Sequence, residues 1–184
     1  LKVTHLLFVN LVMDGLGAIM LGNEPALEKY MLEKPRRRDE SIVSKKMMAQ
    51  IVTMGLWLTV MSFVYLKAPF FQEIFDYDEE QHLTGYFVLF IVSALFNGFN
   101  VRDDGFGIFR GLNQNTGFLK VFFTIILVQA VIVNAALIPF EAFTWIGNMF
   151  SCVPFGIKGW ITVFILAATM IPVDIVRKVI VNRK

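Results

Sequence analysis

Apolar residues gather in five long runs along the chain, and polar stretches separate the runs. The runs cover residues 4–22, 45–66, 84–101, 117–138 and 158–180. A helix needs about 20 apolar residues to cross the hydrocarbon core of a bilayer, and each run approaches that length. Because lipid leaves no backbone polar group unpaired, helices are favoured for all five runs. The sequence therefore predicts an all-α fold, a polytopic membrane helix bundle with five transmembrane helices.

The runs differ in how clearly they predict a span. The second (MMAQIVTMGLWLTVMSFVYL) and the fourth (FLKVFFTIILVQAVIVNAALIPF) are nearly free of charge. The third is short and ends in two asparagines, and the fifth is interrupted by Pro172 and Asp174. The chain begins at Leu1 without an initiating Met and enters an apolar run within a few residues, so we expect a piece of a longer protein.

Composition supports a membrane protein and excludes several kinds of site. Hydrophobic residues make up 56% of the chain and charged residues 17%, against about a quarter charged in soluble domains. The single cysteine, Cys152, excludes an internal disulfide framework and multi-cysteine metal sites. His5 and His82 lack metal-ligand spacing. No Gly-rich phosphate loop and no nucleophile elbow is present, so no catalytic residue and no cofactor-binding residue is predicted.

Basic residues predict the orientation of the spans, because Lys and Arg favour cytoplasmic loops. Fourteen of the seventeen fall on one side of the five spans, in the first loop, the third loop and the tail. The other side holds Lys2, Lys67 and Lys158, beside the acidic stretch QEIFDYDEE. The sequence therefore predicts an integral, multi-pass membrane protein with a cytoplasmic C-terminus. The run at 36–38 (RRR) fits this inside-positive loop better than a nucleic-acid site, so we expect membrane lipid and no nucleic acid as a partner.

The first span carries polar residues where lipid is expected. Asn10 and Asp14 are spaced i, i+4 and would leave one face of a helix, and Gly15 and Gly17 follow the carboxylate. A carboxylate at mid-membrane costs roughly 2.5–3.5 kcal/mol on insertion scales. A hard cation takes oxygen ligands, of which Asn10 and Asp14 would supply two. The alternative is a structural Asn–Asp pair bonded to a neighbouring helix, with the glycines allowing close packing.

Other polar residues in the spans have structural interpretations. Single amides in membrane helices more often join helices than bind ions. This applies to Gln50, Gln129, Asn97, Asn100 and Asn134. We expect Asp174 to form a local ion pair with Arg177 or Lys178. The Trp residues are expected to face lipid or the membrane interface.

The stretch FVNLVMDGLGAIMLGNEP, residues 8–25, resembles the sixth transmembrane helix of P-type cation-transporting ATPases. Similarity continues through KPRRRDESIVSKKMM and returns at FVLFIVSALFNGFNVR, which resembles helix eight of calcium pumps. The last two spans match in position and hydropathy. The resemblance thus covers residues 1–184 as one domain, the C-terminal helices six to ten, and is closest to plasma-membrane-type calcium pumps.

The resemblance implies that Asn10 and Asp14 coordinate the transported cation, with calcium as the first candidate and manganese or a monovalent ion as alternatives. Pumps of the sarcoplasmic-reticulum type carry a Thr where this chain has Met13, and a helix-eight Glu where it has Ala94, three residues before Asn97. The plasma-membrane type lacks both residues. These departures argue against a second ion site and leave the first intact.

The resemblance also implies what lies outside these residues. The phosphorylated Asp, the cytoplasmic domains that use ATP and Mg²⁺, and helices one to five are absent from the 184 residues, so this chain alone would not hydrolyse ATP. Its expected partners are lipid and the remaining helices and cytoplasmic domains of the same pump. A channel subunit or a non-enzymatic helical scaffold is the alternative function, although a channel would need polar residues on several spans.

Overall fold

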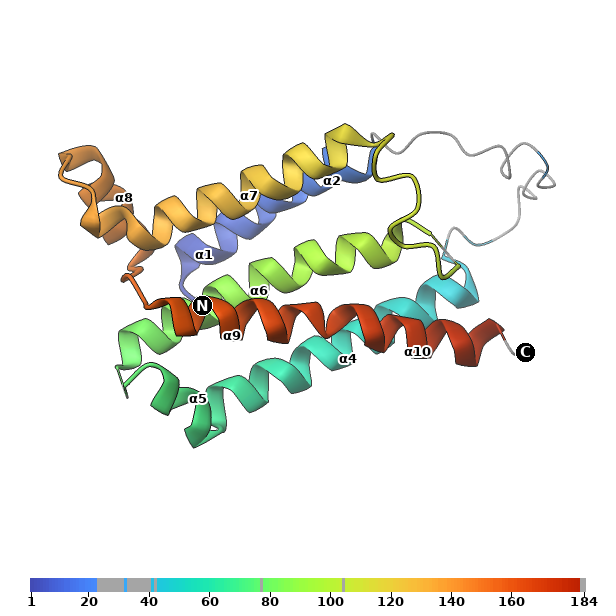
Figure 1. The fold of residues 1–184 in the computed structure, drawn as a ribbon, viewed down its shortest axis with the longest axis horizontal. Coiled ribbons are helices and arrows are strands. Elements are labelled where there is room, and N and C mark those ends of the chain that lie inside the picture. Colours follow the sequence, from blue (N-terminus) through green and yellow to red (C-terminus); the bar gives the residue numbers. More distant parts are fainter. Residues whose placement is uncertain (23–31, 33–40, 42, 77, 104, 183–184) are drawn as a thin grey trace.

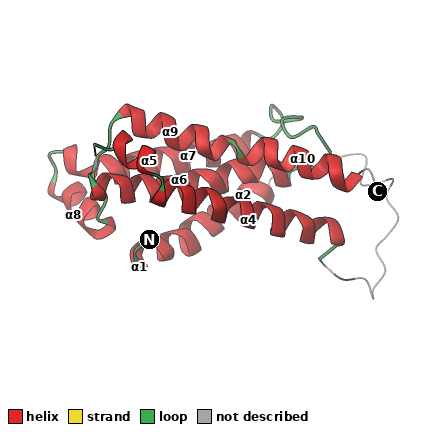
Figure 2. Ribbon diagram, turned by 90° about the horizontal axis from the view of Figure 1, so that it is seen from below, coloured by secondary structure: helices red, strands yellow, loops and turns green. Residues whose placement is uncertain are grey.

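The computed structural model describes residues 1–22, 32, 41, 43–76, 78–103 and 105–182. Within them the fold is all-helical, and five helical stretches are long and apolar enough to cross a membrane. These stretches are Val3–Gly22, Lys45–Lys67, Glu79–Val101, Thr116–Leu137 and Ile157–Val181. They run along one common direction in both views (Figure 1, Figure 2). The prediction of a five-helix membrane bundle is confirmed.

Several spans are built from more than one helical segment. The first comprises α1 (Val3–Phe8), a π-helical turn (Val9–Met13) and α2 (Asp14–Gly22). The second and third are single helices, α4 (Lys45–Lys67) and α6 (Glu79–Val101). The fourth is α7 (Thr116–Asn134) with a 3₁₀ turn (Ala135–Leu137), and the fifth is α9 (Ile157–Ala168) followed by α10 (Met170–Asn182). Two short helices, α5 (Pro69–Ile74) and α8 (Glu141–Phe150), lie between spans.

Polar caps place the helix starts. The Asp78 carboxylate accepts hydrogen bonds from the amides of Glu80 and Gln81, at 2.9 and 3.1 Å, and so satisfies two amides that a helix start leaves unpaired. For this reason α6 begins at Glu79, five residues before the predicted start at 84. Ser44 caps α4 in the same way, through the amide of Met47.

The third span, α6, is the centre of the bundle. It joins two hydrophobic cores, one with the first span, α7 and α8, and the other with α4, α5 and α9. Phe87, Val88 and Leu89 on α6 are fully buried. By contrast, Phe63 on α4 is 64% exposed, as suits a side chain that meets lipid. Helices with outward apolar faces therefore surround one buried helix.

The fifth span breaks one turn before Pro172. Proline has no amide hydrogen, so Pro172 cannot donate to the carbonyl of Ala168, four residues earlier. Helix α9 ends at that residue, and α10 resumes at Met170. The Thr169 hydroxyl at the break accepts a hydrogen bond from Trp57 Nε1 of α4 at 3.0 Å. The interruption predicted at Pro172 is thus present, whereas Asp174 lies within regular helix, and Trp57 joins two helices in place of a purely lipid-facing role.

The predicted cytoplasmic location of the positively charged loops can be tested by cysteine labelling. In the full-length protein, cysteines introduced at Arg37 and Asn182 should be unreactive toward an impermeant maleimide added outside the cell, and one at Glu79 should react. Native Cys152 adds little background, because it is 3% exposed and burial raises the pKa of its thiol to about 12. Labelling at Arg37 from outside would overturn the orientation. Residues 33–40 lie outside the described part of the chain.

Candidate cation site

The first span departs from α-helical geometry at the polar residues. The amide of Asp14 donates to the carbonyl of Val9, five residues earlier, which closes a π-helical turn over Val9–Met13. Such turns are rare and recur at functional sites. Asn10 and Asp14 therefore lie within one wide turn. Their side chains are not related as those of two residues four apart in a regular α-helix are. The hydropathy pattern carries no signal for this turn.

Neither polar side chain of the first span is satisfied by the part of the bundle that the structure describes. Both Asn10 and Asp14 are exposed. Within the described residues, neither side chain has a hydrogen bond or an ion pair to a neighbouring helix. An Asn–Asp pair that joined two helices would show such bonds. The described helices thus give no support to the alternative of a structural pair.

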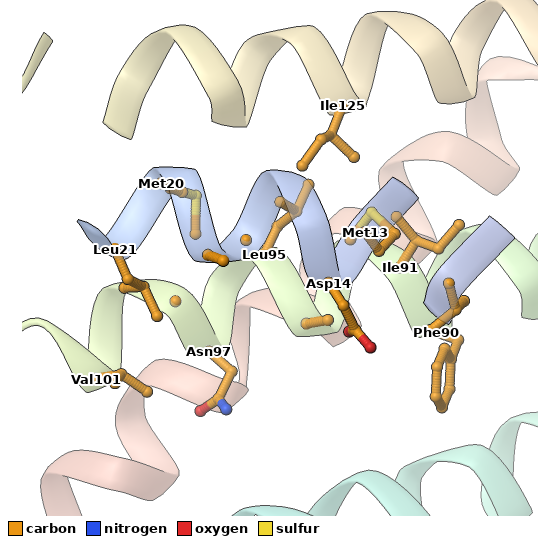
Figure 3. A pocket seen from close by; sticks show the side chains of 15 residues that line it. Met13, Asp14, Met20, Leu21, Phe90, Ile91, Leu95, Asn97, Val101 and Ile125 are labelled. Carbon is orange, nitrogen blue, oxygen red and sulfur yellow. The ribbon is translucent and has the colours of Figure 1, made fainter. Parts of the chain in front are cut away.

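Asp14 lies on the wall of a cavity of about 340 Å³ between the first span and α6. Met13, Ala94 and Asn97 line the same cavity, whereas Asn10 does not. In Figure 3, Asp14 and Asn97 both point away from α7, toward the side on which α4 lies. The structure therefore places Asp14 and the Asn97 amide of α6 in the lining of one cavity, of which Asn10 is not a part.

Asn97 was predicted from the sequence to join two helices, but its printed hydrogen bond lies within α6 and the residue lines this cavity. Its Oδ1 accepts a hydrogen bond of 3.3 Å from Asn100 Nδ2, and a carbonyl oxygen of this kind can accept a second bond. A second cavity, of about 610 Å³ between α4 and α6, shares Ala94, Asn97 and Val101 with the first. The two cavities form one groove between α2 and α4, with α6 as its floor.

Neither glycine after Asp14 is a packing site for the described helices. A Cβ atom added at Gly15 or Gly17 would meet nothing within 4 Å. The close approach of α2 to α6 lies elsewhere, at Gly98, where an added Cβ would collide with the Met20 side chain. Both glycines also lie in regular α-helix, two and four residues after the end of the π-helical turn.

A hard cation at Asp14 would have to find further ligands. Calcium takes six to eight oxygens, and Asp14 supplies one carboxylate. Among the described residues, no group of three or more His, Cys, Asp or Glu side chains lies together. The described part of the chain thus offers a portion of a cation site, open on one side.

A buried ionic cluster lies away from this cavity, where α10 approaches the end of α6. Asp174 is fully buried, and its carboxylate oxygens lie 2.6 Å from Arg177 Nε and 3.0 Å from Lys178 Nζ. Lys178 also donates to the carbonyls of Asn100 and Asp103, at 3.1 and 2.6 Å. The predicted local ion pair of Asp174 is confirmed, and Lys178 of the same cluster joins α10 to the end of α6.

The amides predicted to join helices divide into two groups. Asn100 Nδ2 donates to the carbonyl of Met170 at 3.0 Å and joins α6 to α10, as predicted. Asn134 instead bonds within its own helix, to the carbonyl of Ala130, so for this residue the prediction is wrong. Gln129 is buried, and its amide has no hydrogen-bond partner among the described residues.

Comparison with known proteins decides the family. Residues 1–180 match the family described as cation transporting ATPase, C-terminus. This chain belongs to that family. The membership agrees with the five spans and with the P-type ATPase motif of the first span, and it favours a pump over a channel subunit or a scaffold.

Relatives of this C-terminal region are plasma-membrane calcium pumps. It is 29% identical to plasma membrane calcium-transporting ATPase 1 of Oryctolagus cuniculus and 30% identical to that of Gallus gallus, each over 93% of the chain. It is 27% identical, over 90% of the chain, to plasma membrane calcium-transporting ATPase mca-1 of Caenorhabditis elegans. The chain spans 14%, 14% and 13% of these proteins, respectively. The predicted resemblance to the plasma-membrane type is confirmed.

Proposed function

We propose that this C-terminal region is part of an ATP-driven calcium pump and that its first span supplies ligands to the transported ion. Asp14 is the central ligand, with Asn10 as the neutral one. The single observation that carries the proposal is the state of Asp14, a carboxylate in a membrane span that lies on a cavity wall without a partner among the described residues. A charge so placed is costly unless it meets a cation.

The open groove indicates how the coordination would be completed. Asp14 faces a groove bounded by α2, α4 and α6, and no described helix covers it. Helices of the same pump that lie outside these 184 residues would cover this groove and contribute the remaining oxygens. The π-helical turn makes the backbone around Asn10 irregular. Such a turn suits an ion site whose ligands must move when the pump changes from high to low ion affinity.

Alternating access would connect this site to ATP. Phosphorylation in the cytoplasmic domains, which use ATP and Mg²⁺, would move the membrane helices and change the affinity and exposure of the Asp14 site. The loop 23–46 would lie against those domains and help to carry the motion. Its basic charge suits either a protein surface or anionic lipid headgroups.

The number of transported ions follows from two apolar residues beside Asp14. Met13 and Ala94 line the Asp14 cavity and present no oxygen to it. Since pumps with two ion sites resemble this chain but carry Thr and Glu at these positions, we expect one cation bound per cycle in the full-length protein. Equilibrium binding of radioactive calcium per phosphorylatable site measures this number. A ratio of two would show that other groups replace the missing oxygens.

Transport by the full-length protein tests the proposal as a whole. Inside-out membrane vesicles should accumulate radioactive calcium when ATP is added, and removal of ATP should stop the uptake. Parallel measurements with manganese and sodium identify the preferred ion. ATP-dependent uptake of sodium without calcium would overturn calcium as the substrate, and the absence of uptake of all three ions would overturn the pump.

A further inference from the structure

The fourth span carries a buried amide that no described group satisfies. Gln129 on α7 is 1% exposed, and neither its Nε2 nor its Oε1 has a hydrogen-bond partner among the described residues. An amide without a hydrogen bond in an apolar interior costs free energy, because water no longer solvates it. Asn134 on the same helix avoids this cost by donating to the carbonyl of Ala130. The side chains of this chain already enclose Gln129, so helices outside the 184 residues would not satisfy its amide in this conformation.

Gln129 lies at the level of the π-helical turn in the first span. Ile125 and Ile132, one turn before and one turn after it on the buried face of α7, belong to one core with Phe8 and Met13, at the two ends of that turn. Figure 3 shows Ile125 extending from α7 toward the first span. Gln129 follows Ile125 by about 6 Å along the helix axis. The unsatisfied amide is therefore packed among the side chains that surround the irregular turn.

The π-helical turn provides a backbone acceptor for such an amide. The Asp14 amide donates to the carbonyl of Val9, whereas in a regular α-helix it would donate to the carbonyl of Asn10. A turn that is one residue too wide leaves one carbonyl of the segment without its regular donor, and a buried carbonyl needs a partner. The Nε2 group of Gln129 has two hydrogens to offer.

The proposed ion ligands require this turn to move. Asp14 lines the cavity between the first span and α6, and Asn10 does not. Coordination of one cation by both side chains therefore needs a rotation of the segment between α1 and Asp14. Such a rotation presents different backbone groups of this segment to α7, where Gln129 lies.

We propose that Gln129 is a positioning residue for Asn10. In the cation-bound conformation, Gln129 Nε2 donates a hydrogen bond to a backbone carbonyl of residues 8–10, and this bond holds Asn10 turned toward Asp14. Gln129 itself does not contact the ion. The inference rests on the proposed function of Asn10 and Asp14, and it adds a residue of the fourth span to those that set the ion affinity.

The calcium dependence of uptake by the full-length protein tests this role. Gln129→Met keeps the length and approximate volume of the side chain and removes the amide. The calcium concentration for half-maximal ATP-dependent uptake should rise about fivefold, since one hydrogen bond within a membrane bundle contributes roughly that factor. The apparent Tm of the calcium-free protein should stay the same or rise, because the variant no longer buries an unbonded amide. A purely structural side chain would leave the half-maximal concentration unchanged.

Two further variants separate positioning from a general effect on the helix. Asn134→Leu removes an amide of α7 that bonds within its own helix, so the half-maximal calcium concentration should stay at the wild-type value. In an Asn10→Ala background, Gln129→Met should raise that concentration by less than about twofold, because the ligand that it positions is gone. A further fivefold rise in that background would overturn positioning through Asn10.

The outcomes distinguish this inference from the proposed function. Calcium uptake by the wild type with an unchanged half-maximal concentration in Gln129→Met overturns the inference and leaves the pump intact. Normal calcium affinity in Asp14→Asn overturns the ion site on which the inference rests. If Gln129→Met fails to fold, structures of the wild type with and without calcium decide. Gln129 Nε2 should lie about 2.9 Å from a carbonyl oxygen of residues 8–10 in the calcium form only. An amide that is unbonded, or bonded to a buried water, in both forms would overturn it.

Discussion

Asp14→Asn in the full-length pump is expected to abolish cation-dependent phosphorylation from ATP while the protein is still made and inserted. The substitution keeps the size and much of the hydrogen bonding of the side chain and removes its charge. Insertion should become easier, since the cost of roughly 2.5–3.5 kcal/mol for a charge at membrane depth is gone. The measurement is the yield of radioactive phosphoenzyme as a function of calcium concentration, normalised to the amount of inserted protein.

A structural role for Asp14 predicts the opposite pattern. If the carboxylate held two helices together, the variant would lose expression or stability, and the surviving protein would keep its calcium affinity. Asn10→Ala should have a smaller effect, because it removes a neutral ligand and leaves the charge of Asp14 in place. Calcium affinity should therefore fall less in Asn10→Ala than in Asp14→Asn. Normal calcium affinity in well-expressed Asp14→Asn protein would refute the ion site.

Asp174→Asn is expected to have the largest effect on stability. It leaves Arg177 and Lys178, 8% and 2% exposed, without their shared carboxylate. Removing one partner of a buried ion pair costs about 3–5 kcal/mol, because the remaining charge stays buried and uncompensated. The apparent Tm of the detergent-solubilised protein should fall by about 6 °C or more. Thermal unfolding followed by size-exclusion fluorescence measures it.

Two controls accompany this variant. One makes the same chemical change at an exposed carboxylate, and the other changes a second residue of the cluster. Asp76→Asn alters an exposed carboxylate in the loop before α6 and should leave the Tm unchanged. Adding Lys178→Met to Asp174→Asn should recover part of the loss, because the double variant strands one cation fewer. An unchanged Tm in Asp174→Asn would show that the cluster contributes nothing to holding α10 against α6.

The sequence predicts the spans well because lipid imposes a simple physical rule. A helix in a bilayer must be long and apolar, and this requirement can be read directly from the order of residues. The errors lie at polar ends. Helix α6 begins at Glu79 because Asp78 caps it, whereas hydropathy, which scores polar residues as unfavourable, places the start at 84. Helices α5 and α8 are too short to give a hydropathy signal.

The candidate site was predictable in part. Asp14 stands out because a charge within an apolar run has a known cost, and that cost does not depend on tertiary structure. The π-helical turn and the shared cavity wall of Asp14 and Asn97 depend on how α2 packs against α6, and residue spacing along one chain carries no such information. The break of the fifth span was predictable from Pro172, whereas the contact of Trp57 with Thr169 across it was not.

The position of the bound cation in the full-length pump tests the central claim most directly. Crystals or cryo-electron microscopy grids of the protein with calcium, and crystals with manganese for its anomalous scattering, locate the ion independently of activity. The proposed site requires an ion about 2.3–2.6 Å from an Asp14 carboxylate oxygen in the calcium form, with Asn10 among its ligands. An ion bound elsewhere, with the Asp14 carboxylate hydrogen-bonded to a neighbouring helix, would contradict it.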